Sequence, residues 1–361
     1  MHSLTSGTEL GLSPKWSDFS NNWFGSIFTE NNSSNPYYVV TPAYTRKSAG
    51  IRVLHLLCNS LNKLGYRAHL IIQPQFNFAS PVSPFLNTPV LTRAQLINDY
   101  QRGLTPIVIY PETIGSNLFN APVAFEYLLN FGGLLSGAAN EHVMPQIAYS
   151  EQIRKKSPGC IHTLFIPTSD PRVFYPLKED VVRQGIYFYA AKFQSLYGKI
   201  LNHPEPGMIE IFRKGISAQS TKDLIRIYHT AKRIYLYENS AVATEAAMCG
   251  CPVVFMPSDF LDANITEFEL GSDGMAWGNS KEEIVRAETT VEKFYNHYIE
   301  AYNISRSQLE DFVEYSQELA SQTDYKEKIK VFHTEFFGQL LRLLSNTYGL
   351  AHKVIYKISR G

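Results

Sequence analysis

The stretch of residues 231–257, AKRIYLYENSAVATEAAMCGCPVVFMP, decides the fold class. It predicts a strand over residues 233–237, a short polar loop, a helix over 241–248 and, after a glycine turn, a second strand over 252–256. A strand–helix–strand unit implies parallel strands, with the helix beginning at their carboxyl ends. The chain is therefore expected to be an α/β protein.

Two carboxylates mark this unit. Glu238 lies in the loop before the helix, and Glu245 lies about one turn inside it. Helix N-termini carry unsatisfied N–H groups and partial positive charge, so they suit phosphates and sugar hydroxyls. Because a glutamate rarely goes inside a protein unpaired, we expect each acid to have a partner or a ligand.

A second unit of this kind begins at Pro36. The run YYVVTPAY predicts a strand, IRVLHLLCNSLNKL an amphipathic helix ended by Gly65, and RAHLII the next strand. The loop between the first strand and the helix contains Ser48, Ala49 and Gly50, whose small side chains let backbone N–H groups approach a ligand. The alternative is a surface loop capped by Ser48. Neither G-x-G-x-x-G nor a P-loop is present, so neither dinucleotide nor ATP binding is indicated.

Further along the chain, TPIVIYPE predicts a buried strand that ends at Glu112, at the edge where open α/β sheets bind ligands. A cap or turn role is the alternative for this acid. Helices are expected over 91–103 and 121–130. His142 lies in a glycine-rich connection and is either a catalytic or a structural histidine.

Composition narrows the function classes. The chain has 361 residues, which suggests two domains, and 33 basic residues balance 33 acidic ones, so nothing argues for a nucleic-acid partner. Aromatic residues make up 13%, which suits either stacking on sugars and bases or aromatic cores. The four cysteines at irregular spacing suit a reducing compartment, and Cys249 and Cys251 are expected to be packed thiols and not a metal site.

Location is predicted from what the sequence lacks. No signal-peptide pattern opens the chain and no run of about 18 apolar residues occurs, so a cytoplasmic, soluble protein is expected. The basic amphipathic C-terminal tail suggests two alternatives. It rests on the anionic inner face of the plasma membrane, as a peripheral contact, or it docks on the domains.

The repeated α/β unit and the residues Glu245-Ala246, Gly250, Pro252, Val253 and Val254 resemble the GT-B glycosyltransferases, especially the retaining nucleotide-sugar-dependent group with an E-x7-E motif. The run TRKSAGIRVLHLLCNSLNKLGYRAHL is similar to that group's first loop and helix. The run YPETIGSNLFNAPVAFEYLLNFGG resembles bacterial surface-polysaccharide transferases, including rhamnosyltransferases. The resemblance covers residues 36–300.

The fold class implied is two Rossmann-like domains facing a cleft, with C-terminal helices. The chain would divide into an N-terminal arm (1–35), an acceptor domain (36–170), a nucleotide-sugar donor domain (171–300) and C-terminal helices returning to the acceptor domain (301–361).

The resemblance also implies roles. Glu245 would hold the donor ribose, and Lys192 with Lys199 would offset the diphosphate charge. These charged contacts would make a metal or other cofactor unnecessary. The loop Ser48-Ala49-Gly50 would face the cleft. The diphosphate or the donor sugar would meet the loop made of Tyr237, Glu238, Asn239, Ser240 and Ala241.

Two departures from the family pattern bear on the mechanism. Glu238 and Glu245 are one residue closer than the motif requires, and no arginine partner for the lysine is evident. In a retaining enzyme the leaving diphosphate would act as base. An inverting enzyme needs a carboxylate or histidine near the acceptor hydroxyl, and Glu112 and His142 are the candidates.

The expected function is glycosyl transfer from a UDP-, dTDP- or GDP-linked sugar to a glycan or lipid-linked acceptor in bacterial surface-polysaccharide synthesis (O-antigen or capsule), with rhamnosyl transfer as one candidate. Two alternatives remain: another sugar-nucleotide enzyme such as an epimerase, and a non-catalytic GT-B-like module.

Overall fold

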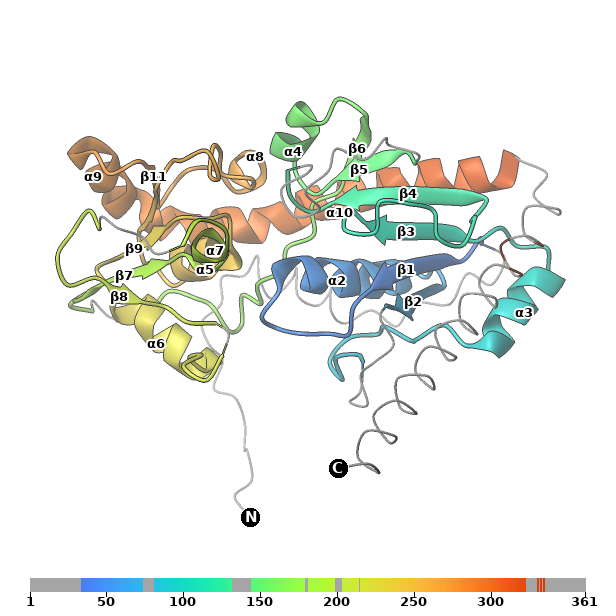
Figure 1. Cartoon of the computed structure of the whole chain (residues 1–361), viewed down its shortest axis with the longest axis horizontal. Coiled ribbons are helices and arrows are strands. Elements are labelled where there is room, and N and C mark those ends of the chain that lie inside the picture. Colours follow the sequence, from blue (N-terminus) through green and yellow to red (C-terminus); the bar gives the residue numbers. More distant parts are fainter. Residues whose placement is uncertain are drawn as a thin grey trace, which may run out of the picture.

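The computed structural model describes residues 34–73, 81–131, 144–178, 181–198, 203–213 and 215–322, with 330, 332 and 334 in addition. Two parallel sheets, each flanked by helices, lie beside each other and are joined by a long helix (Figure 1). The predicted fold class, two Rossmann-like α/β domains with a helical C-terminal part, is confirmed.

The first domain contains a six-stranded sheet in the order β2-β1-β3-β4-β5-β6, with every pair parallel. Its elements are β1 Tyr37–Thr41, α2 Ala49–Lys63, β2 Ala68–Ile72, α3 Arg93–Gln101, β3 Ile107–Pro111, β4 Val123–Leu128, β5 Gln146–Ala148, α4 Glu151–Lys156 and β6 Cys160–Thr163. The central strands are buried over nearly their whole length, as expected for a parallel sheet with helices on its faces.

The second domain contains a five-stranded parallel sheet in the order β11-β10-β9-β7-β8. Its elements are β7 Ile186–Tyr189, α5 Ala191–Tyr197, β8 Ile209–Glu210, α6 Thr221–Thr230, β9 Arg233–Leu236, α7 Ala241–Met248, β10 Val253–Phe255, α8 Glu267–Leu270, β11 Met275–Trp277, α9 Lys281–Thr290 and the 3-10 helix η1 Val291–Lys293. The strand–helix–strand unit predicted from residues 231–257 is therefore β9–α7–β10.

The helix α10, Phe294–Gln322, ties the two domains together. It contacts α7 and α8 of the second domain and β4 and β6 of the first (Figure 1). Phe312 of this helix packs on Phe125 of β4 with ring centroids 5.2 Å apart, and Ser316 lies 2.8 Å from the hydroxyl of Tyr37. Tyr298 accepts a hydrogen bond from the backbone of Ser169, in the segment between the sheets.

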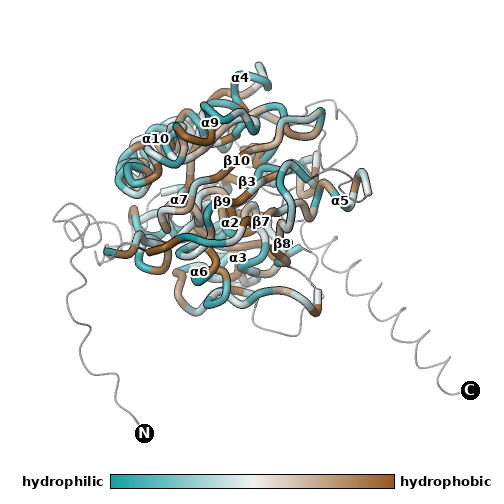
Figure 2. The backbone as a smooth tube through the Cα atoms, turned by 90° about the vertical axis from the view of Figure 1, so that its left-hand side faces the viewer, coloured by the Kyte–Doolittle hydropathy of each residue, from teal (hydrophilic) through white to brown (hydrophobic). Residues whose placement is uncertain are grey.

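Local chemistry explains the helix starts. Ser48 caps α2 by accepting from the backbone N–H of Ile51, and Ser220 with Asp223 forms a capping box on α6. Gly250, at φ +75°, supplies the left-handed turn between α7 and β10. In Figure 2 the hydrophobic colour gathers on the interior strands, and hydrophilic segments lie on outer helices such as α4 and α9.

One predicted element is wrong. Residues 121–130 were expected to be helical, but they contain β4, Val123–Leu128. Their sequence VAFEYL is rich in aromatic and β-branched residues, and β4 pairs with β3 on one side and β5 on the other. The tertiary pairing overrides the weak helical pattern.

Several predictions fall outside the described residues: His142, Lys199, nearly all of the N-terminal arm and the basic tail over residues 335–361. The domain boundaries at 170 and 300 stay a prediction. Within the described part of the chain, no helix combines the length and the apolar character needed to cross a bilayer.

Candidate functional site

Both sheets reverse their strand order at one place. In the first domain the reversal lies between β1 and β3, and in the second between β7 and β9. Open α/β sheets bind ligands beyond the carboxyl ends of the strands at such a switch point. Glu112 directly follows β3, Lys192 lies just after β7, and Glu238 lies just after β9. The fold therefore places all three predicted site residues at switch points.

Glu112 is a buried acid whose pKa lies near neutral pH. It is 9% exposed, and its Oε2 accepts a hydrogen bond of 3.2 Å from the backbone N–H of Leu129. Burial raises the pKa of its carboxyl to about 7, the charge of Glu126 adds to this rise, and the ammonium of Lys192 opposes it. Lys192 belongs to the other domain, so the two predicted catalytic residues follow strands of different sheets, and their common role stays a prediction.

Glu238 anchors the opening of α5. The carboxylate is 1% exposed, and its Oε2 accepts hydrogen bonds from the backbone N–H groups of Lys192 and Phe193, the second at 3.2 Å. A negative charge is favourable at these unsatisfied helix-opening donors. Glu238 thus fixes the backbone that carries Lys192. Its contact with a donor stays a prediction.

Glu245 is fully buried and lies between two arginines. Its Oε1 accepts from Arg52 at 3.1 Å, and its Oε2 accepts from Arg213 at 2.9 Å and from the hydroxyl of Tyr228 at 3.4 Å. Arg52 belongs to α2 of the first domain, and Arg213 follows β8 of the second. The side chains of both arginines are no more than 10% exposed. Burial lowers the pKa of Arg213, but the interactions with Glu245, Tyr228 and Tyr189 together outweigh this and raise it.

The sequence interpretation missed both arginines. Arg213 carries a usable signal, since it is a basic residue just beyond the carboxyl end of a strand. Arg52 carries none, because it lies among the apolar residues of an ordinary amphipathic helix.

The remaining loop residues of the second domain have structural contacts. Asn239 donates to the carbonyl of Ala263 at 2.9 Å and accepts from the backbone of Ile265 at 3.2 Å, so it links its loop to the loop after β10. Ser240 caps α7, and Ala241 is the first residue of that helix. Their backbone lies at the switch-point edge of the sheet, where the prediction placed the donor.

Packing explains why the loop Ser48-Ala49-Gly50 of the first domain consists of small residues. Ser48 is the cap of α2 and Ala49 its first residue. A Cβ added at Gly50 would lie 3.3 Å from the side chain of Leu129, which follows β4. The loop therefore approaches the same backbone that holds Glu112. The capped turn is present in the structure, and the role of this loop as a cleft wall stays a prediction.

Aromatic rings gather beside α5, the helix that contains Lys192. Tyr237 and Phe193 lie 5.8 Å apart, and Phe260 lies 5.8 Å from Tyr197 and 6.1 Å from Phe193. Tyr197 is 60% exposed, whereas Tyr237 is buried and its hydroxyl meets no hydrogen-bond partner among the described residues. Phe193 and Tyr197 belong to α5, which follows β7, and Tyr237 and Phe260 lie in the loops after β9 and β10, so these rings line one edge of the sheet.

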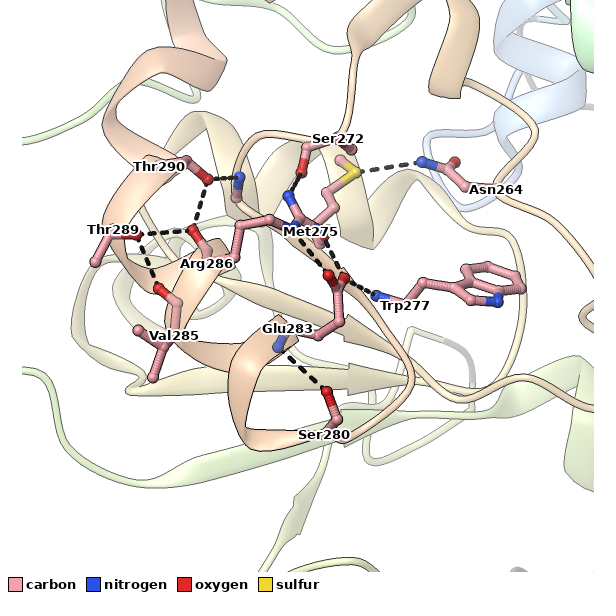
Figure 3. A network of polar contacts seen from close by, with 11 residues as sticks. Asn264, Ser272, Met275, Trp277, Ser280, Glu283, Val285, Arg286, Thr289 and Thr290 are labelled. Carbon is pink, nitrogen blue, oxygen red and sulfur yellow. Dashed lines mark hydrogen bonds and ion pairs between the residues drawn. The ribbon is translucent and has the colours of Figure 1, made fainter.

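A cavity of about 280 Å³ opens near the ends of β10 and β11, lined in part by residues of the polar network that Figure 3 shows. Arg286 beside it pairs with Glu283 at 2.7 Å and donates to two backbone carbonyls, and Glu283 accepts from the backbone N–H of Trp277 at 3.1 Å. The nearby arginine holds the pKa of Glu283 down at about 2. These charges hold α9 on β11. The cavity is lined by Phe255, Asn264, Glu267, Ser272, Met275, Ala276, Trp277, Glu283 and Arg286.

The thiols are all internal. Cys58, Cys160, Cys249 and Cys251 are buried and form no disulfide, and the pair expected to be packed thiols is fully buried. Within the described residues, no group of three or more His, Cys, Asp or Glu side chains is placed to hold a metal ion.

No protein-family model and no curated protein sequence matches the chain. Solved structures with a similar arrangement are glycosyltransferases by their titles. One from Rickettsia africae has 10% identity and a TM-score of 0.43, with 81% of this chain and 100% of that chain covered. AviGT4, involved in avilamycin A biosynthesis, has 15% identity and a TM-score of 0.40, covering 80% and 99%. The spinosyn rhamnosyltransferase SpnG has 10% identity and a TM-score of 0.36, covering 82% and 100%.

Proposed function

We propose that this protein is a glycosyltransferase of the GT-B type that moves a sugar from a nucleotide-diphosphate donor to a glycan or lipid-linked acceptor. The observation that supports the proposal is the placement of Glu112 in one domain and Lys192 in the other, each just beyond the strand that borders the switch point of its own sheet. A base from one domain and a cation from the other are what transfer between two bound substrates requires.

In this proposal the second domain binds the donor. Lys192 offsets the charge of the leaving diphosphate, with Lys199 as companion, and charge-assisted contacts of this kind make a metal unnecessary. Arg213 is the cation that the sequence pattern lacked. Glu245 holds the ribose hydroxyls, and the backbone from Tyr237 to Ala241 meets the diphosphate and the sugar. The exposed ring of Tyr197 offers a face for stacking.

The first domain supplies the acceptor side. Glu112, with its pKa near 7, removes the proton from the acceptor hydroxyl as that oxygen attacks the anomeric carbon. A protein carboxylate in this position favours the inverting outcome over the retaining one. The Ser48–Gly50 loop forms the wall opposite the donor.

The proposed pathway, location and donor follow from the sequence resemblance to bacterial surface-polysaccharide transferases. We place the reaction in bacterial surface-polysaccharide synthesis at the cytoplasmic side of the plasma membrane, with the basic tail as a peripheral contact. The donor is linked to UDP, dTDP or GDP, and a deoxyhexosyl group such as rhamnosyl is a candidate sugar. The run that contains Glu112 supports this placement through its likeness to polysaccharide transferases.

The test is a thermal-shift screen of the purified chain with UDP-, GDP-, dTDP- and CMP-sugars, because a ligand that binds only the folded state raises its melting temperature. A hit is then assayed for transfer to glycan and lipid-linked acceptors, with Lys192→Ala as the matched variant of lowered turnover. Stabilisation by no nucleotide sugar contradicts the proposal and leaves a non-catalytic module. Release of an epimerised nucleotide sugar without acceptor would select an epimerase.

A further inference from the structure

Glu245, the proposed ribose ligand, has no free face in this closed arrangement. It is fully buried, and each carboxylate oxygen already accepts a hydrogen bond from an arginine, Arg52 at 3.1 Å on one side and Arg213 at 2.9 Å on the other. Two neighbouring ribose hydroxyls donate to a carboxylate most strongly when both oxygens are available. A donor therefore needs one of these partners to leave.

The two arginines differ in how they are attached. Arg213 and Tyr228 belong to the same domain as Glu245, so a movement of one domain relative to the other would leave their contacts with it intact. Arg52 lies on α2 of the first domain, so domain opening withdraws it. Its Nη1 also donates to the carbonyl of Thr168 at 3.4 Å, which lies in the segment between the sheets. Arg52 would thus keep its hydrogen bond to the carbonyl of Thr168 after it separates from Glu245.

A second contact of Arg213 joins the same two domains. Nη2 of Arg213 donates to the backbone carbonyl of Arg46 at 3.5 Å, in the loop before α2. Opening therefore separates Arg52 from Glu245 and Arg213 from the first domain together. The result is a donor domain in which Glu245 keeps Arg213 as its counter-charge and gains a free oxygen.

We propose that Arg52 is an internal competitor of the donor: it occupies Glu245 while the donor site is empty, holds the two domains closed, and is displaced by the donor ribose. This inference rests on the proposed function, in which Glu245 binds that ribose. It assigns to Arg52 the regulation of donor entry. A protein whose binding-competent state is only partly populated shows a weaker apparent affinity in proportion to that population.

The competition predicts a gain of affinity on removing a charged partner. Arg52→Ala leaves Glu245 paired with Arg213, so no buried carboxylate is left without a counter-charge. We expect this variant to bind free UDP, dTDP or GDP, whichever the wild type accepts, at least about fivefold more tightly, because the closed state no longer competes. If Arg52 instead helps to position Glu245 for the donor, the same variant binds the nucleotide more weakly.

The experiment combines calorimetry with small-angle scattering on four proteins: the wild type, Arg52→Ala, Arg52→Lys and Arg306→Ala. Arg306 forms an exposed pair with Glu310 on α10 and serves as the charge-matched control. We expect Arg52→Ala to raise both the nucleotide affinity and the radius of gyration of the ligand-free protein, Arg52→Lys to lie between it and the wild type, and Arg306→Ala to change neither.

The outcomes separate the two proposals. Unchanged or weaker nucleotide binding by Arg52→Ala, or an unchanged radius of gyration, overturns the competition while the proposed function stands on wild-type binding. Binding of no nucleotide by the wild type and Arg52→Ala alike overturns the proposed function, and the competition with it.

Discussion

Glu269 of the second domain accepts a hydrogen bond of 2.7 Å from the backbone N–H of Glu151 in the first. Glu151 is the first residue of α4, so the carboxylate satisfies a helix-opening donor from across the domain boundary. Close by, Nζ of Lys155 in the first domain lies over the ring of Phe268 in the second, 3.7 Å from the ring centroid. This contact and the Arg52–Glu245 pair hold the domains together at two places.

Glu269 makes this contact sensitive to pH. Burial raises the pKa of its carboxyl to about 7, above the usual 4.5, although the backbone N–H of Glu151 opposes the rise. A group whose pKa is raised on folding contributes stability that is complete below pH 4.5 and is lost as pH rises through 7. Glu269→Gln keeps the acceptor and removes the titration. We expect its melting temperature to fall less than that of the wild type between pH 5 and about 7.5.

Thermal unfolding across this pH range checks the expectation. Glu283→Gln serves as the control, because the pKa of Glu283 is low and its carboxylate stays ionised throughout. Parallel pH curves for wild type and Glu269→Gln would contradict the assignment.

Glu112 predicts the pH dependence of catalysis. A general base acts in its deprotonated form, and burial raises the pKa of this carboxyl to about 7, so kcat/KM should rise with pH through that value. Glu112→Gln should lower turnover by about 10²- to 10⁴-fold and abolish the rise. Rate profiles from pH 5.5 to 8.5 with both proteins provide the measurement. Calorimetry should give equal nucleotide affinities for the two, and a persisting rise in the variant would exclude Glu112 as the base.

The fold could be predicted from sequence because its decisive signals are local. The strand–helix–strand pattern of residues 231–257 and the capping residue Ser48 each reside in a short stretch, and both are found in the structure. The error over residues 121–130 arose where pairing on both sides of β4 determined the conformation.

The candidate site could be predicted only in part, because its contacts join distant residues. The position of Glu112 followed from the rule that ligand sites lie beyond the carboxyl ends of strands, and Lys192 and Glu238 followed from the family resemblance; the structure places all three just after strands, and their roles stay predictions. Arg52 was not found, since its contact with Glu245 spans 193 positions and depends on how the domains face each other. The prediction for Glu238 identified the place but not the helix-anchoring hydrogen bonds, which need the backbone of α5 beside it.

Lys192 is predicted to act on the leaving group. The ammonium offsets charge that develops on the diphosphate as the glycosidic bond breaks, so Lys192→Ala should lower kcat by at least about tenfold, with little change in the KM for the acceptor. The variant retains the backbone N–H of residue 192, which donates a hydrogen bond to Glu238. Steady-state kinetics with varied acceptor at saturating donor tests this. A change confined to the acceptor KM would assign the lysine to the other substrate.

Glu245 needs two substitutions, because the structure gives it a second role. Glu245→Ala leaves Arg52 and Arg213 buried without their counter-charge, which typically costs about 3–5 kcal/mol of stability. Glu245→Gln also removes the counter-charge, but it keeps the side-chain volume and one acceptor oxygen, and its melting temperature is measured beside its donor affinity to separate binding from folding. We expect Glu245→Gln to stay folded and to weaken nucleotide-sugar binding at least tenfold, about 1.4 kcal/mol.

The double variant shows whether Arg52 acts through Glu245. If the arginine competes for this carboxylate, Arg52→Ala should give little further gain in nucleotide affinity in the Glu245→Gln background, because the contested charge is already gone. Calorimetry on the wild type, both single variants and the double variant completes the cycle. Undiminished donor binding by a folded Glu245→Gln protein would remove Glu245 from the donor site, and an additive cycle would mean that Arg52 acts elsewhere.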